Sequence, residues 1–136
     1  MPFWAEKVGV FDPATSFFSQ VDIFATGEFF GWTYGGGVLV PSGKIVFVPH
    51  HANHVGVFDP ESSIFETVDI SSTISMDYKY FGAVLTPNGN VVFIPWVAGN
   101  VGVFDPATSA FSVVDITTSR YDYFGGSQSE NITLHL

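Results

Sequence analysis

Residues 8–23 read VGVFDPATSFFSQVDI, and two later stretches of the chain repeat them almost letter for letter. Residues 55–70 read VGVFDPESSIFETVDI and residues 101–116 read VGVFDPATSAFSVVDI, so the copies start 47 and 46 residues apart. Eleven of the sixteen positions are identical in all three copies. A fixed period of this length indicates a repeat architecture, in which one supersecondary unit is stacked several times.

The repeating unit reads as four short β-strands. In residues 80–116 the strand candidates are YFGAVL, NVVFIP, VGVF and FSVVDI. Turn signals separate them: Pro87-Asn88-Gly89, a loop with glycine at 96–100, and Asp105-Pro106. Short runs rich in Val, Ile and Phe between such signals are typical of strands, and no segment has helical periodicity. Four antiparallel strands in this length predict the all-β blade of a β-propeller.

Each copy contains an Asp-Pro turn, and its aspartate has a structural interpretation. Proline presets φ for the first central position of a type I turn, and the preceding aspartate can accept hydrogen bonds from N–H groups of the turn. A second aspartate falls in the outermost strand, where a charge blocks pairing with another sheet. We expect structural roles for the turn residues Asp12, Asp59 and Asp105 and for the edge residues Asp22, Asp69 and Asp115.

The units predict one domain, residues 1–136, built as half of a propeller. Residues 32–70 and 78–116 each hold a complete blade, with strands named a to d from the centre outwards. Residues 1–23 supply only strands c and d of a split blade, and residues 121–136 supply only strands a and b. The sequence therefore predicts about three blades, one of them divided between the two ends of the chain.

Three blades do not close a ring, because propellers use about four to eight. An open arc would leave unpaired strand edges and uncovered apolar surface. We therefore expect a homodimer in which the half-blades of two chains pair twice and complete a six-bladed ring. A trimer would need more blades than this range allows. The alternative is that the chain is a fragment of a longer six-bladed protein.

The repeat resembles the blades of the virginiamycin B lyase-like, SMP-30-like and quinoprotein-like propellers. The shared element is a strand followed by V-x-V-F-D-P-x-T, here VGVFDPAT, VGVFDPES and VGVFDPAT. The resemblance covers almost the whole chain and implies the propeller fold, whereas these groups share no single chemistry. Their enzymes use His, Glu, Asp or Asn around the central channel, often with a divalent metal. We find no complete set of such ligands here, so we transfer no catalytic residue.

Composition excludes several classes of function. Four Lys and Arg face thirteen Asp and Glu, a formal net charge of −9, so phosphate backbones and anionic membranes should be repelled. The absence of cysteine excludes disulfides and thiolate chemistry. No stretch has the length of a membrane-spanning helix, and the first residues lack the pattern of a secretory signal, so we expect a cytoplasmic location by default.

Divergence between the copies points to a binding face. The a-b and c-d turns are nearly constant, whereas the b-c loops (PFWAEK, PHHANH, PWVAGN) and the d-a loops (FATGEFFGWT, SSTISMDYK, TTSRYD) differ. Variable loops on a rigid scaffold are typical of a binding surface, and aromatic rings beside carboxylates suit sugar rings. The alternative is that these aromatics pack between blades. The predicted ligand-binding residues are Trp4, Glu28, Trp32, His50, His51, Asp77, Tyr78, Trp96, Arg120 and Asp122.

The segment HHANH suggests a metal site as a further hypothesis. Three imidazoles, from His50, His51 and His54, can hold Zn²⁺ or a similar divalent ion, although an ordinary polar loop explains them as well. We therefore favour a non-enzymatic binding module for a glycan or other small ligand, with no cofactor. The alternatives are a metal-assisted hydrolase or lyase with Glu28 or Asp77 as the base, and a structural assembly protein with no ligand.

Overall fold

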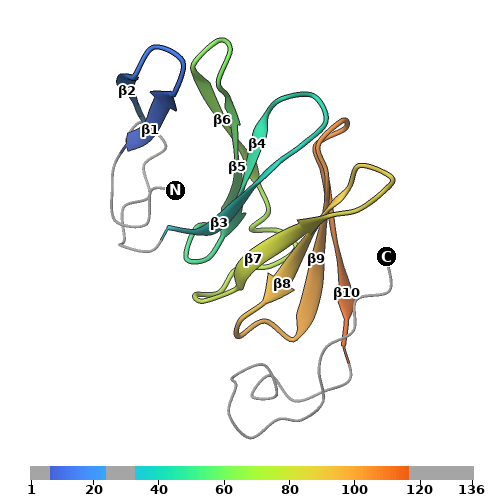
Figure 1. The fold of residues 1–136 in the computed structure, drawn as a ribbon. Coiled ribbons are helices and arrows are strands. Elements are labelled where there is room, and N and C mark those ends of the chain that lie inside the picture. The colour runs from blue at the N-terminus through green and yellow to red at the C-terminus, as the bar shows by residue number, and fades with distance from the viewer. Residues whose placement is uncertain (1–6, 24–32, 117–136) are drawn as a thin grey trace, which may run out of the picture.

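The computed structural model of the chain describes residues 7–23 and 33–116, and within them it contains ten β-strands and no helix (Figure 1). These residues accordingly hold no helix long and apolar enough to cross a membrane. The strands are β1 (Lys7–Asp12), β2 (Phe17–Asp22), β3 (Tyr34–Leu39), β4 (Ile45–Pro49), β5 (His54–Asp59), β6 (Ile64–Asp69), β7 (Tyr80–Leu85), β8 (Val91–Pro95), β9 (Asn100–Asp105) and β10 (Ala110–Asp115).

The strands form two four-stranded sheets and one hairpin. Both larger sheets run in chain order, β3-β4-β5-β6 and β7-β8-β9-β10, and every neighbouring pair is antiparallel. The hairpin β1–β2 has the register of the third and fourth strands of the larger sheets, since Val8 pairs with Val21 as Val55 pairs with Val68. The four-strand units predicted from the sequence are therefore confirmed, with strand ends within about one residue of expectation.

The Asp-Pro turns have the geometry that their sequence predicts. The side-chain oxygen of Asp12 accepts a hydrogen bond from Ala14 N–H at 2.9 Å, and Asp59 and Asp105 accept the equivalent bonds at 3.0 and 2.9 Å. Each turn ends on a serine with positive φ, between 56° and 60°. A type I turn followed by one left-handed residue is a common hairpin connection, so the repeated segment specifies its own turn.

Each sheet has two apolar faces of different composition. In the β3–β6 sheet the valine face contains Val46, Val48, Val55, Val57 and Val68, and the phenylalanine face contains Tyr34, Phe47, Phe58 and Phe65. This division follows from strand geometry, because successive side chains point to opposite sides of a sheet. The same alternation gives the hairpin a valine face with Val8, Val10 and Val21 and a phenylalanine face with Phe11 and Phe18.

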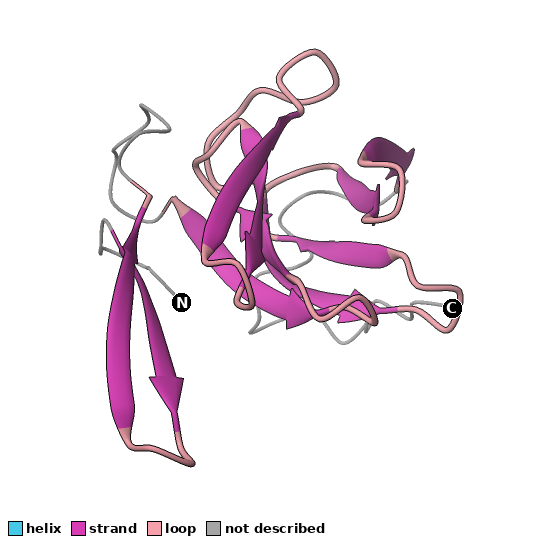
Figure 2. Ribbon diagram, turned by 90° about the horizontal axis from the view of Figure 1, so that it is seen from above, coloured by secondary structure: helices cyan, strands magenta, loops and turns pink. Residues whose placement is uncertain are grey.

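The sheets stack with the valine face of one against the phenylalanine face of the next. The valine face of the hairpin packs on the phenylalanine face of the β3–β6 sheet in one apolar cluster. The valine face of the β3–β6 sheet packs on Tyr80, Phe93, Phe104 and Phe111 of the β7–β10 sheet in a second cluster. The inner strands β3 and β7 lie side by side, so the sheets fan out from them (Figures 1 and 2).

The invariant glycine of the VGVFDP segment is required by this packing. A Cβ atom on Gly56 would lie 2.7 Å from the Phe65 ring and 3.1 Å from the Tyr34 ring. On Gly102 it would lie 3.0 Å from the rings of Phe111 and Tyr80. Aromatic rings therefore cover the backbone of the third strand directly, and any larger residue would push them away from the phenylalanine face.

Candidate functional site

Backbone hydrogen bonds draw three loop segments together at one end of the two larger sheets. The N–H of Lys79 donates to the His50 carbonyl at 2.9 Å, and the Lys79 carbonyl accepts from Trp96 N–H at 2.9 Å. The N–H of Val97 donates to the Tyr78 carbonyl, also at 2.9 Å. We call the resulting surface the loop face; it comprises residues 50–53, 71–79 and 96–99.

A buried lysine holds these segments together. Lys79 has no exposed surface, and its ammonium group donates to the carbonyls of Met76 at 2.6 Å and His51 at 3.2 Å and to Asn53 Oδ1 at 3.3 Å. An ammonium group carries three donors, and a buried charge is tolerated only when such bonds are made. Lys79 therefore joins the loop after β4 to the loop before β7.

Tyr78 has a backbone conformation that favours glycine. Its φ is 55°, which is uncommon for a bulky non-glycine residue. The hydrogen bonds of the Tyr78 and Lys79 backbone to the loop after β8 hold it there. The result is a tyrosine that is 46% exposed and presented on the loop face. Residues held in this region often lie at ligand sites, so the backbone itself marks this position.

Five aromatic rings form a continuous row across the loop face and the start of β7. The ring centroids are 5.6 Å apart for Trp96 and Phe81, 5.7 Å for Phe81 and His50, and 5.5 Å for His50 and Tyr78. His51 ends the row, 4.4 Å from Tyr78. Trp96, Phe81 and Tyr78 are between 37% and 46% exposed, so their rings offer apolar surface to solvent next to buried His50.

An exposed carboxylate lies at the end of this row. Asp77 Oδ1 is 3.3 Å from His51 Nδ1, and the aspartate side chain is 73% exposed whereas that of His51 is 17% exposed. A carboxylate within hydrogen-bond reach of an imidazole nitrogen orients the ring. The loop face thus combines apolar rings, an imidazole oriented by a carboxylate, and a charged hydrogen-bond acceptor.

His50 is held as a neutral imidazole beneath Tyr78 and Phe81. Its Nδ1 lies 2.8 Å from the Tyr80 carbonyl, which can only accept, so Nδ1 carries the proton and donates it. Burial is the largest cause that lowers the pKa of His50; the bond to Tyr80 and the charge of Asp77 oppose it, and the charges of His51 and Lys79 add to it. A neutral ring in this position serves as a rigid support for the exposed aromatics.

The three histidines of the predicted metal site are not brought together. His54 is at the start of β5, where its Nδ1 hydrogen-bonds the Tyr34 hydroxyl at 2.8 Å. In the next sheet Asn100 takes the same position and accepts from the Tyr80 hydroxyl. His54 is thus a structural partner of a core tyrosine. Residues 7–23 and 33–116 contain no group of three or more His, Cys, Asp or Glu that could hold a metal ion.

Five of the ten predicted ligand-binding residues lie in the described part of the chain, and the other five lie outside it. His50, His51, Asp77 and Tyr78 lie together, and Trp96 joins them through Phe81. Five predicted residues lie outside the described part of the chain: Trp4, Glu28, Trp32, Arg120 and Asp122.

Two residues of the site were not among the predicted ligands. Phe81 belongs to the predicted strand and gave no signal beyond apolar character. Lys79 did carry a signal, because the equivalent residue of the preceding unit is Thr33. Both residues use the backbone carbonyl in the same way: Thr33 accepts from His50 N–H at 3.1 Å, and Lys79 accepts from Trp96 N–H. A lysine at a position where only the backbone carbonyl is required indicates an additional role for its side chain.

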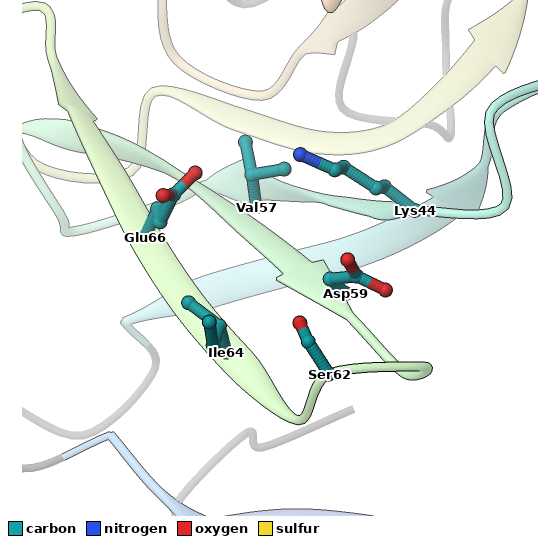
Figure 3. A pocket seen from close by; sticks show the side chains of 6 residues that line it. All are labelled: Lys44, Val57, Asp59, Ser62, Ile64 and Glu66. Carbon is teal, nitrogen blue, oxygen red and sulfur yellow. The ribbon is translucent and has the colours of Figure 1, made fainter.

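Two hollows lie away from the loop face. One of about 130 Å³ lies beside the Asp-Pro turn of the β3–β6 sheet, where the Lys44 amino group and the Asp59 and Glu66 carboxylates line it with Val57, Ser62 and Ile64 (Figure 3). Another of about 300 Å³ is lined by turn residues, including Pro41, Asn88 and Pro106. Both adjoin the repeated turns, so we place the candidate site at the loop face.

Comparison with known proteins identifies the fold and no closer relationship. No protein-family model matches the chain, and no curated protein matches its sequence. The structure is similar to virginiamycin B lyase from Staphylococcus aureus, a β-propeller, with a TM-score of 0.67 and 14% identity over 85% of this chain. It is also similar to the extracellular domain of a protein from B. thetaiotaomicron, with a TM-score of 0.55 and 8% identity over 76% of this chain.

These similarities confirm the propeller-like fold. The chain spans only 36% of the lyase and 16% of the second protein, so each is considerably longer than this chain. At such low identity the shared feature is the scaffold, which hosts many activities. The resemblance to propeller blades predicted from the VGVFDP repeat is therefore confirmed at the level of the fold.

Replacement of the buried lysine tests its role in forming the loop face. We expect Lys79→Met to lower the free energy of unfolding by about 2–4 kcal/mol, because three hydrogen bonds from a charged group disappear and leave their partly buried acceptors unpaired. Lys7→Met, at an exposed position, is the matched control and should change stability by less than about 0.5 kcal/mol. Urea denaturation measures both. Equal stability of the two variants would contradict the role assigned to Lys79.

The lowered pKa of His50 predicts a loss of stability in weakly acidic solution. Its folded-state pKa lies below the ordinary value of 6.5, so the unfolded chain takes up the proton first as the pH falls. The contribution of His50 to stability is therefore constant above that value and decreases below it, until the folded protein is protonated as well. The His50→Asn variant, which can still donate to the Tyr80 carbonyl, should show a smaller decrease.

Chemical denaturation between about pH 7 and about pH 5 measures this difference. The turn residues Asp12 and Asp59 affect stability in a different pH range. Hydrogen bonds from the turn lower their pKa values from 3.8, so their contribution to stability is lost only as the pH falls below that value. Parallel curves for wild type and His50→Asn would contradict a buried neutral imidazole.

Proposed function

We propose that this protein is a non-enzymatic binding module whose ligand lies against the loop face. The observation that carries the proposal is the convergence of His51, Asp77, Tyr78 and Trp96 from three loops that differ between the repeats. These loops are fixed by a buried ammonium group and by backbone hydrogen bonds, so the surface is rigid before a ligand arrives. Preorganisation of this kind favours binding because little conformational entropy is lost.

The chemistry of the loop face suits a carbohydrate. More broadly, it suits a small polar ligand that has one apolar side. The exposed rings of Tyr78, Phe81 and Trp96 can stack on the C–H face of a sugar. Asp77 and His51 stand at one end of the row, where a carboxylate oxygen can accept hydrogen bonds from hydroxyl groups. Binding sites of this type combine mostly apolar contact with a few placed polar groups.

We favour binding over metal-assisted hydrolysis or elimination. A divalent ion in a protein site needs several converging ligands, and the hydrogen bond between His54 and Tyr34 takes one predicted ligand away from His50 and His51. The proximity of Asp77 to His51 is the observation that keeps an enzymatic role as the second candidate, because a base oriented by a carboxylate recurs in catalytic sites. A purely structural assembly protein is the third.

We also propose that two copies of the chain close a six-bladed ring as a homodimer. In this arrangement the hairpin β1–β2 of one copy completes a blade with the C-terminal strands predicted for residues 121–136 of the other. The support is the stacking rule within the chain, in which each sheet covers one face of the next. Two loop faces, related by a two-fold axis, would then open on the same end of the ring.

A glycan array followed by titration calorimetry tests the proposed binding. We expect a glycan to bind, and Tyr78→Ala and Trp96→Ala each to weaken its affinity about tenfold, because a stacked ring contributes on the order of 1 kcal/mol beyond its buried area. Phe17→Ala, at an aromatic residue that is 66% exposed away from the loop face, should leave the affinity unchanged.

The same titrations separate the candidate functions. Affinity that survives a chelator supports a binding module, whereas a stoichiometric metal lost together with turnover in His51→Ala supports the enzymatic alternative. If no glycan binds, or if Phe17→Ala weakens binding as much as Trp96→Ala, the loop face is not a carbohydrate site.

A further inference from the structure

We propose that the phenylalanine face of the hairpin β1–β2 is an interaction surface for the outermost strand β10 of a second copy of this chain. The inference rests on the ring proposed above and goes beyond it by assigning the two contacting surfaces and their orientation. The contact is head to tail: one copy contributes its first sheet, and the other contributes its last.

The first surface is apolar and uncovered. Phe11 is 59% exposed and Phe18 is 56% exposed, although both belong to the invariant part of the repeat. Phe58 and Phe104 occupy the position of Phe11 in the other two copies and are 1% and 0% exposed. The same residue type in the same local structure is thus buried twice and exposed once, and the exposed copy is at the start of the stack.

The second surface is uncovered at the opposite end of the stack. Val114 on β10 is 57% exposed, whereas Val21 and Val68, at the equivalent positions of β2 and β6, are half-buried. Ile116 is half-buried, whereas the equivalent Ile23 and Ile70 are buried. On β8 and β9 of this sheet the valine-face residues Val92 and Val101 are buried, so the uncovered area lies over β10.

The two surfaces match each other in kind and in position. Inside the chain, a valine face packs on a phenylalanine face twice, in the same direction each time. The hairpin consists of only the third and fourth strands of a unit, and the uncovered part of the last sheet lies over its fourth strand, β10. A second copy is therefore the occupant that continues the existing interface (Figure 2 shows the hairpin at one side of the molecule).

The proposed dimer explains how the chain can carry two exposed apolar surfaces. Exposed apolar side chains on strands are a risk for association between sheets. A head-to-tail contact between identical copies either closes a ring or extends into a filament, depending on the rotation between copies. With two such contacts around a two-fold axis, both surfaces of both copies are covered and the assembly ends at two chains.

Paired charge substitutions test the assignment. Phe18→Asp disables the phenylalanine face, and Val114→Asp disables the valine face. Because each places an unpaired charge in an apolar contact, each should weaken self-association about 100-fold or more. Ile64→Asp is the matched control: Ile64 is 53% exposed on the outer strand of the middle sheet, and its replacement should leave the assembly intact. Light scattering during size-exclusion chromatography gives the masses, and circular dichroism verifies that each variant is folded.

Mixing the two variants gives the decisive result. A head-to-tail interface predicts that an equimolar mixture of Phe18→Asp and Val114→Asp regains dimer, because one of the two contacts in the mixed pair is intact. The milder pair Phe18→Ala and Val114→Ala repeats the test if a charged variant does not fold.

Each other outcome overturns the assignment in a distinguishable way. If Phe18→Asp dissociates the dimer and Val114→Asp does not, the contact joins two phenylalanine faces. If neither variant changes the mass of a wild-type dimer, other surfaces join the copies. A wild-type monomer overturns the ring itself, while leaving ligand binding at the loop face to be judged by its own titrations.

Discussion

The packing of a valine face on a phenylalanine face is the interaction on which the rest of the structure depends. Each sheet is apolar on both sides, so no sheet is stable alone and each requires a neighbour on either side. The rule explains why glycine recurs at the positions of Gly56 and Gly102, where aromatic rings cover the backbone. It also explains why equivalent phenylalanines differ in exposure, because the phenylalanine faces of the two larger sheets are covered by a neighbouring valine face, whereas that of the hairpin is at the end of the stack.

The candidate site is a consequence of this stacking. The loops after β4 and before β7 belong to different sheets, and only the packing of those sheets brings them together. Lys79 then fixes the junction, since its ammonium group and its backbone form hydrogen bonds with both loops. The positive φ of Tyr78 and the exposed ring that it presents follow from that junction. A change that separates the sheets should therefore disrupt the loop face, whereas a change in the loop face can leave the stack intact.

The sequence contained enough information to predict the strands, the turns and the face on which variable loops gather. Alternating apolar residues and the Asp-Pro turns act over a few residues, so local rules predict them. The burial of Lys79, the bond between His54 and Tyr34, and the left-handed Tyr78 are set by contacts between segments about 20–30 residues apart, which periodicity does not encode. Adjacent histidines suggested a metal site for the same reason: spacing alone does not say which ring a core tyrosine will engage.

An X-ray structure of the assembled chain would test the central claim most directly, because it reports both the number of blades and the chain to which each strand belongs. We predict one closed ring of six four-stranded sheets from two chains. In two of those sheets, the hairpin β1–β2 of one chain would pair with strands from the other, and Phe11 and Phe18 would be buried. A ring in which each hairpin pairs with strands of its own chain, or a single chain with Phe11 and Phe18 exposed, would contradict it.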